Sequence, residues 1–342
     1  MGETYTVRLE PVGIEFEVDE DETVLRGAFR QGLMLMHGCK EGQCAACKSF
    51  LLDGEVDLDK YSTFALNDFE KEEGWTLLCR AHAVSDLEVE LINYDEEVLR
   101  SGIALQTQPM RVERVDALTH DIRRLVLSGT PLTFKPGQYV DIAIPGSDEV
   151  RSFSMANTPS SSPGQLEFMI KIYPDGKFSS LLADDELKEG DELEVTGPYG
   201  VFTLREKSDR PLLFIGGGAG MAPILSLIRS MAENGNPRQA VYYYGARGPK
   251  DLFHLDELAE LERRMPNFRF VPALSHCGEN EPWEGERGLI TDVVMRLHQE
   301  LGEVDAYLCG PPPMVDAAIA MLDQNGVPEA RVYYDKFTTT AP

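Results

Sequence analysis

The alternation of apolar and polar residues gives the first part of the chain a recognisable order of elements. Residues 4–18 alternate as a β-hairpin does, residues 24–30 follow an acidic run as a capped helix, and residues 87–92 alternate as a closing strand. A hairpin, a helix and returning strands around a loop of small residues predict a β-grasp domain over residues 1–98. The alternation is lost after the closing strand, so we place a linker at residues 97–108.

The rest of the chain shows two further patterns of predicted strands, turns and helices. Between residues 109 and 206, short β-like runs are separated by Pro and Gly clusters, with one helical candidate at residues 178–184. This pattern predicts an antiparallel β-barrel that carries a single helix. From residue 207 to residue 342, strand, glycine turn and helix alternate, as in an open parallel α/β sheet. We therefore expect three domains, 1–98, 109–206 and 207–342.

Four cysteines in the first domain have the spacing C-x4-C-x2-C followed by a distant fourth: Cys39, Cys44, Cys47 and Cys79. This spacing is typical of a plant-type [2Fe-2S] cluster. Glycine and alanine fill the loop, so backbone N–H groups have room to converge on the sulfur atoms. Zinc also binds four thiolates, but zinc ribbons favour two C-x2-C pairs and only one pair here has that spacing. Free cysteines are the other alternative. We interpret the four as iron ligands.

A second group of residues has the chemistry that a flavin nucleotide requires. Residues 151–154 place a cation, an aromatic ring and two hydroxyl groups on one strand-like run. A guanidinium pairs with pyrophosphate, a ring packs on the isoalloxazine, and a hydroxyl hydrogen-bonds near its N5 edge. Gly176 opens the predicted helix, whose N–H groups suit the same pyrophosphate. The predicted FAD ligands are Arg151, Ser152, Phe153, Ser154, Gly176, Lys177, Phe178 and Ser179.

Two turns in the last domain have the character of nucleotide-phosphate turns. Residues 216–223 follow an apolar strand and precede a helix, and residues 309–314 end a later strand. The first turn is not G-x-G-x-x-G, because Met221 replaces its third glycine. Ligands bind at the carboxyl ends of parallel strands, so both turns are expected to face one nucleotide, with Cys309 either near the nicotinamide or simply a small buried hydrophobe. The predicted ligands are Gly217, Gly218, Ala219, Gly220, Pro223, Gly310, Pro311 and Met314.

The net charge of −26 is concentrated near the N-terminus, where residues 1–100 hold 23 Asp or Glu against 9 Lys or Arg. Such a surface repels nucleic acid and anionic membranes and favours a basic protein partner near the cluster, although solubility alone also explains it. The chain has no apolar run of the roughly 18 residues that a membrane helix needs, and no basic segment precedes its first strand. We expect a soluble, cytoplasmic protein.

With the three motifs in this order, the chain resembles the reductase components of bacterial multicomponent oxygenases, in which a ferredoxin domain is fused to an FAD and NAD module of the ferredoxin–NADP reductase type. The sequences around Cys79 and over residues 151–159 look most like those of soluble diiron monooxygenase reductases of the methane, propane and phenol type, the propane type being our first expectation. The resemblance implies two further cofactor-binding residues, Lys171 and Phe337. It also implies three catalytic residues, Ser154, Cys309 and Asp335.

The resemblance also implies a reaction: NADH gives a hydride to FAD, and single electrons then pass through the [2Fe-2S] cluster to the diiron hydroxylase of a monooxygenase. One alternative is delivery to a Rieske aromatic-ring dioxygenase. Another is a non-catalytic iron–sulfur redox sensor, which the two nucleotide turns disfavour because a sensor needs no hydride donor. The choice of NADH rather than NADPH rests mainly on the resemblance. Arg247 and Lys250 follow the second strand of the nucleotide domain, near where a 2′-phosphate would lie, so the residues themselves leave the choice open.

Overall fold

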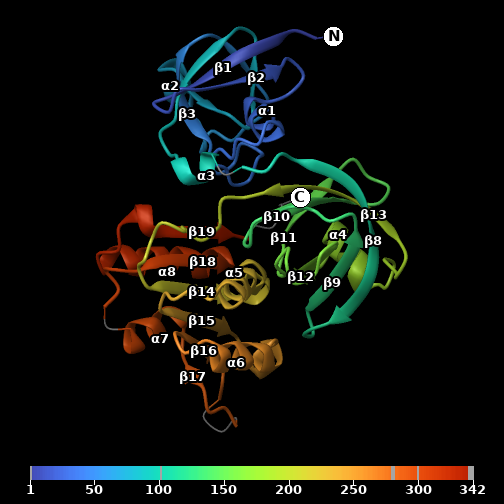
Figure 1. The fold of residues 1–342 in the computed structure, drawn as a ribbon, viewed down its shortest axis with the longest axis vertical. Helices are drawn as coiled ribbons and strands as arrows, with labels where there is room; N and C mark the ends of the chain where they lie inside the picture. Colours follow the sequence, from blue (N-terminus) through green and yellow to red (C-terminus); the bar gives the residue numbers. More distant parts are fainter. Residues whose placement is uncertain (1, 101, 279–281, 299, 338–342) are drawn as a thin grey trace. The chain divides into compact units, whose positions relative to one another are not determined.

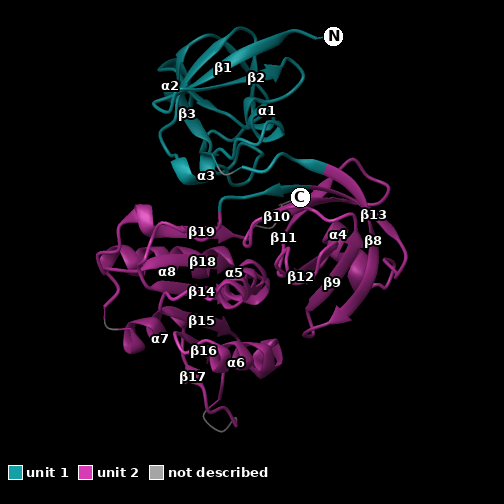
Figure 2. Cartoon of the chain, in the orientation of Figure 1, with its two compact units in different colours: residues 1–106, 197–201 teal, residues 107–196, 202–342 magenta. Residues whose placement is uncertain are grey.

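The computed structural model describes residues 2–100, 102–278, 282–298 and 300–337 (Figure 1). The chain forms two compact units (Figure 2). Unit 1 comprises Met1–Gln106 and Gly197–Val201, and unit 2 comprises Thr107–Thr196 and Phe202–Pro342. The predicted barrel and α/β domains thus lie mainly in one unit. Of the helices that the structure describes, none has the length and apolar character needed to cross a membrane.

Unit 1 has the predicted β-grasp fold. Its sheet has the order β2-β1-β7-β3-β5, in which β1 pairs antiparallel with β2 and parallel with β7. Helix α1 begins after Thr23, whose side chain accepts a hydrogen bond from the Arg26 amide, and it buries Leu25 and Phe29. The elements are β1 (Thr4–Glu10), β2 (Ile14–Asp19), α1 (Val24–Arg30), β3 (Lys48–Asp53), β4 (Val56–Leu58), α2 (Asp68–Glu72), β5 (Trp75–Leu77), β6 (Ala81–Ala83), β7 (Leu87–Glu90) and α3 (Glu96–Arg100).

The linker predicted at residues 97–108 is wrong in its first part. Helix α3 occupies the start of this segment, and its Val98 and Leu99 side chains are buried. The Asp95 carboxylate caps the helix by accepting from the Val98 amide, and the Leu99 carbonyl accepts from the Met34 amide at 3.4 Å. Two adjacent apolar residues after an acidic run therefore form a docked helical turn, and unit 1 extends to Gln106.

The first part of unit 2 is the predicted antiparallel barrel with one helix, α4, between its last two strands. The strand order is β11-β10-β13-β8-β9-β12, and a bridge between Met155 and Phe168 joins the two edges so that the sheet curls on itself. Phe168 and Phe178 are buried in its core. The elements are β8 (Gln106–Ala117), β9 (Ile122–Gly129), β10 (Tyr139–Ala143), β11 (Val150–Ser154), β12 (Gln165–Lys171), α4 (Lys177–Ala183) and β13 (Glu192–Tyr199).

The second part of unit 2 is the predicted parallel sheet, with the order β17-β16-β15-β14-β18-β19. Alternate residues of β14 face opposite layers: Phe214 packs in the layer of α5 and α6, and Ile215 in the layer of α7 and α8 (Figure 1). The elements are β14 (Leu212–Gly217), η1 (Gly218–Gly220), α5 (Met221–Asn234), β15 (Ala240–Ala246), η2 (Pro249–Asp251), α6 (Leu255–Arg264), β16 (Phe268–Leu274), β17 (Glu286–Arg287), α7 (Ile290–Leu297), β18 (Asp305–Gly310), α8 (Pro312–Gln324), η3 (Glu329–Arg331) and β19 (Val332–Lys336).

Candidate functional site

The four cysteines of the predicted cluster lie together in unit 1 as two pairs. The Cys44 thiol donates to Cys39 and the Cys47 thiol donates to Cys79. No three of these sulfur atoms lie within 4.8 Å of one another. A single tetrahedral zinc ion would bring all four to roughly 4 Å from each other, given its Zn–S distances. Two separate pairs instead suit a two-iron cluster in which four thiolates ligate the irons.

The loop around the first pair directs backbone N–H groups at the sulfur atoms. Cys39 Sγ accepts from the amides of Glu41 at 3.4 Å and Gln43 at 3.2 Å. Together with the Cys44 thiol, which contributes most, these donors lower the pKa of Cys39 to about 5. A low thiol pKa favours the thiolate that binds metal. Cys44 is exposed whereas Cys47 and Cys79 are buried, so one pair lies closer to solvent.

Glycine is required at two places in this loop. Gly42 has a φ of +69°, and a Cβ atom there would lie 2.8 Å from Cβ of Tyr61. A Cβ atom on Gly38 would lie 2.9 Å from Cys44 Sγ. The small residues that the sequence shows between the cysteines therefore leave the space that the sulfur atoms and a cluster need. The Gly42 amide also donates to Cys79 Sγ, which lowers the pKa of Cys79 together with the larger effect of Cys47.

Strand β11 carries the predicted flavin residues of the barrel. Ser152 Oγ donates to Asp141 Oδ1 on β10 at 2.6 Å, and the Phe153 ring packs against Phe178 of α4 with 4.9 Å between ring centroids. Gly176 is the residue before α4, and a Cβ atom there would lie 2.3 Å from Ser179 Oγ. The structure thus brings the strand and the start of the helix together, as the sequence predicted.

Each basic residue predicted at the flavin site has a carboxylate partner. Arg151 Nη2 lies 2.9 Å from Glu149 Oε2, and Lys177 forms an ion pair with the same carboxylate. Lys171 pairs instead with Asp121, the residue before β9. The ammonium of Lys177 and the guanidinium of Arg151 lower the pKa of Glu149. The sequence reading missed Glu149, although residues i and i+2 share one face of a strand.

Ser154, Cys309 and Asp335 come from three distant parts of the sequence and meet in unit 2. The register of β18 and β19 pairs Cys309 with Asp335, and the Ser154 hydroxyl donates to the Asp335 carboxylate. Burial raises the pKa of Asp335 to about 6, against the opposing effect of the Ser154 hydrogen bond. Burial also raises the pKa of Cys309, and the charge of Asp335 adds to this. Cys309 is therefore a neutral thiol beside a carboxyl group whose pKa is raised to about 6.

The two glycine turns at the ends of β14 and β18 are in contact. A Cβ atom on Gly220 would lie 2.3 Å from the carbonyl oxygen of Cys309, and one on Gly217 would lie 2.8 Å from Met314 Sδ. The Phe337 amide donates to the Gly310 carbonyl at 3.0 Å, which places the end of β19 beside the second turn. Residues 338–342, which the sequence shows beyond Phe337, lie outside the described residues.

A charged network that the sequence reading missed joins the barrel to the parallel sheet. Arg229 of α5 reaches Glu167 of β12 at 2.7 Å and Glu257 of α6 at 2.6 Å, and it donates to the Ala156 carbonyl at 2.9 Å. Burial opposes ionisation of Glu257, but hydrogen bonds from His254 and Arg229 lower its pKa to about 2. No local sequence pattern predicts these pairs, because their members lie far apart in the chain.

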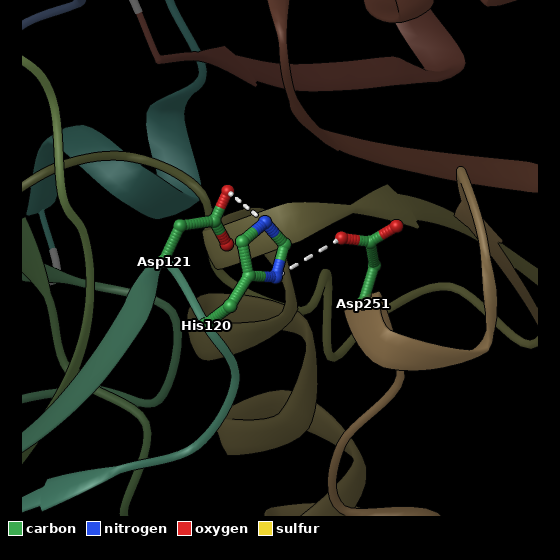
Figure 3. Close-up of side chains that lie close together, drawn as sticks. All are labelled: His120, Asp121 and Asp251. Atoms are coloured by element: carbon green, nitrogen blue, oxygen red, sulfur yellow. Dashed lines mark ion pairs between the residues drawn. The ribbon is translucent and has the colours of Figure 1, made fainter.

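A second cluster in unit 2 consists of His120, Asp121 and Asp251 (Figure 3). The imidazole lies between the two carboxylates, with Nε2 3.4 Å from Asp121 Oδ2 and Nδ1 3.6 Å from Asp251 Oδ1. The Lys171 ammonium already pairs with Asp121, so a metal ion here would meet a competing positive charge. We interpret the cluster as an ion-pair contact between the β8–β9 turn and η2.

Comparisons with known proteins match all three predicted regions. Residues 7–84 match the model of the 2Fe-2S iron-sulfur cluster binding domain, residues 109–204 that of the oxidoreductase FAD-binding domain, and residues 214–319 that of the oxidoreductase NAD-binding domain. These matches define an iron–sulfur flavoprotein oxidoreductase that binds a nicotinamide nucleotide.

Comparison with individual proteins shows to which family of iron–sulfur flavoprotein oxidoreductases the chain belongs. The propane 2-monooxygenase reductase component of Rhodococcus jostii (strain RHA1) is 52% identical over 347 residues, covering 100% of this chain and 93% of that protein. The toluate 1,2-dioxygenase electron transfer component of Pseudomonas putida is 33% identical over 326 residues, 95% of each. The crystal structure of the Amycolatopsis cytochrome P450 reductase GcoB superimposes with a TM-score of 0.89 at 32% identity, covering 98% of this chain and 100% of that one. The chain belongs to the family of reductase components of multicomponent oxygenases, which confirms the resemblance seen in the sequence.

Proposed function

We propose that this protein transfers electrons from NADH, through FAD and the [2Fe-2S] cluster, to the diiron hydroxylase of a propane-type monooxygenase. The observation that carries the proposal is the 52% identity, over the whole chain, to a propane 2-monooxygenase reductase component. The paired cysteines and the meeting of Ser154, Cys309 and Asp335 support it, since they supply a cluster site and a nicotinamide site in one chain. Because such a reaction draws on cellular NADH, we also infer that the protein works in the cytoplasm.

At the cluster site, we propose that Cys39, Cys44, Cys47 and Cys79 are the iron ligands. The amides of Glu41 and Gln43 stabilise negative charge on the Cys39 sulfur, and Gly42 does the same for Cys79. We also propose three functional domains with the predicted bounds 109–206 and 207–342 for the second and third, and with the first extended to residue 106.

At the flavin site, bound FAD supplies the conversion of a two-electron hydride donor into single electrons. We propose that Arg151 and Lys177 exchange their shared partner Glu149 for the FAD pyrophosphate, which also receives N–H groups at the start of α4. The Phe153 ring would then pack on the isoalloxazine. Ser152, Phe178 and Ser179 hold the strand and the helix start in place, and Lys171 adds positive charge nearby.

At the nicotinamide site, we propose that the turns at residues 217–223 and 310–314 bind the NADH phosphates. Ser154 and Asp335 orient the flavin edge and the nicotinamide, while the neutral Cys309 thiol gives the ring an apolar contact. Phe337 covers the same site from the end of β19. A partly buried carboxylate at Asp335 favours the positive charge that the nicotinamide would acquire when its hydride leaves.

An anaerobic titration with NADH tests the electron path. We expect loss of flavin absorbance and a rhombic [2Fe-2S] signal in low-temperature electron paramagnetic resonance. A reconstituted protein with no visible spectrum would refute the cluster assignment. A comparison of kcat/KM for the two nucleotides tests the choice of donor, and a preference for NADPH would overturn it.

The partner is tested by reconstitution with oxygenase components. We expect NADH-dependent product formation with the hydroxylase of a propane 2-monooxygenase. The second candidate, a Rieske aromatic-ring dioxygenase, is supported by the 33% identity to the toluate 1,2-dioxygenase electron transfer component. Faster turnover with a dioxygenase component than with the hydroxylase would favour that alternative. An absence of NADH oxidation with ferricyanide as acceptor would point to the redox sensor instead.

A further inference from the structure

Phe64 in unit 1 is an aromatic side chain with almost no protein around it. It is 97% exposed, more than any of the other large hydrophobic residues described as exposed, and it lies between β4 and α2. Single exposed apolar residues are common on protein surfaces and need no explanation by themselves. The position of Phe64 relative to the cluster ligands is what gives it a role.

A short series of hydrogen bonds connects Phe64 to the cluster loop. The Phe64 amide donates to Ser62 Oγ at 3.2 Å, and the Ser62 amide donates to the Gly42 carbonyl at 3.0 Å. The Gly42 amide in turn donates to Cys79 Sγ. The two residues after Phe64, Ala65 and Leu66, are buried. The backbone on both sides of Phe64 is therefore fixed, and the ring is held in solvent beside a ligand loop.

Phe64 lies in an acidic segment of the sequence. Residues 57–73 contain six acidic and two basic side chains. Asp57, Asp68, Glu72 and Glu73 are all exposed. An exposed aromatic side chain in an acidic segment fits a partner that has an apolar pocket with Lys or Arg at its rim, since aromatic anchors contribute most of the affinity and charged rims steer association. A second copy of this acidic chain would be repelled.

We propose that Phe64 is the anchor by which unit 1 docks onto the oxygenase component, with the exposed carboxylates of residues 57–73 meeting a basic rim on that partner. This inference rests on the proposed function, because it assumes that the cluster passes electrons to an oxygenase. In each transfer the cluster loses one electron and an iron centre of the partner gains it, and no covalent bond forms. Docking at Phe64 brings the partner against the loop that carries the cluster ligands.

The test compares Phe64→Ala with the wild type in NADH-dependent turnover by the Rhodococcus jostii propane 2-monooxygenase hydroxylase. We expect the reductase concentration for half-maximal turnover to rise about tenfold, as for loss of an aromatic hot spot. Phe64→Tyr, which keeps the ring, should retain most of the activity. Leu52→Ala removes another exposed apolar side chain of unit 1, at the end of β3 away from Cys47, and should behave as the wild type.

Ferricyanide reduction and the visible cluster spectrum show whether each variant is intact, and both should be unchanged in Phe64→Ala. If wild-type protein supports turnover and Phe64→Ala matches it at every reductase concentration, the anchor is refuted and the proposed function stands. If the wild type is reduced by NADH but supports no turnover, the proposed function fails for this partner. An equal loss in Leu52→Ala would also overturn the anchor, because the effect would then be general to surface apolar residues.

Discussion

The cysteine loop of unit 1 and the proposed nicotinamide site of unit 2 are built in opposite ways. Three of the four cysteines lie within nine consecutive residues, and backbone amides of the same loop donate to their sulfur atoms. Ser154, Cys309 and Asp335 are instead spread over more than half of the chain and meet through strand register. A local site is therefore encoded by spacing and small residues, whereas a distributed site depends on the packing of the whole unit.

The largest effect is expected at the local site. Cys47→Ser should abolish electron delivery to an oxygenase, because it removes a buried thiol that we propose as a ligand of the cluster. Reduction of ferricyanide by NADH should persist, since the flavin and nicotinamide residues lie in unit 2. Cluster absorbance and both rates are the measurements. Cys277→Ser, at a cysteine outside the motif, is the matched control. Equal loss of both rates in Cys47→Ser would contradict the separation of the two sites.

The distributed site is tested by a pH profile. Burial raises the pKa of Asp335 to about 6, so the carboxylate forms as the pH rises through that value. We expect the rate of flavin reduction by NADH, measured by stopped flow, to increase across this range, because the ionised group stabilises the positive nicotinamide. Asp335→Asn should be slower by about tenfold above pH 7 and should lack this inflection. An inflection unchanged in Asp335→Asn would assign it to another group.

The packing that maintains the distributed site is tested at Arg229. Arg229→Gln leaves the buried Glu167 without one of its cationic partners and should lower the free energy of unfolding by about 3 kcal/mol. Denaturant unfolding measures this change, and slower flavin reduction should accompany it. Arg263→Gln breaks an exposed pair with Glu260 and should change the free energy of unfolding by less than about 1 kcal/mol. Similar values for the two variants would show that the network is unimportant.

The smallest effect is expected at the glycine turn that follows β14. The Tyr244 hydroxyl donates to the Gly218 carbonyl at 3.3 Å, whereas the buried Tyr242 hydroxyl has no hydrogen-bond partner among the described residues. Tyr244→Phe should raise the KM for NADH by roughly fivefold, the effect of about 1 kcal/mol, with FAD content unchanged. Tyr242→Phe removes the same atom two residues away and should leave KM unaltered. A shift of equal size in both variants would argue against an orienting role for Tyr244.

The sequence predicted most of the fold because each region has a clear period. Alternation of apolar and polar residues predicted the β-grasp domain. Short strands separated by Pro and Gly clusters predicted the barrel, and the strand–turn–helix order predicted the parallel sheet. The linker was the exception: Val98 and Leu99 are too few to show a helical period, and only their burial reveals α3. In the same way, the partners of Arg151 and Lys177 became visible only when the strand placed Glu149 between them.

By itself, the sequence determined the spacing of the four cysteines, on which the proposed cluster site rests, and the positions of the two glycine turns, because those features depend on residue spacing and on the absence of side-chain bulk. The tertiary structure alone decided which thiols pair, that Cys309 lies next to Asp335, that Arg229 links the barrel to the sheet, and that Phe64 is left in solvent. These properties follow from burial and from contacts between distant segments, and burial is a property of the folded chain rather than of any window of its sequence.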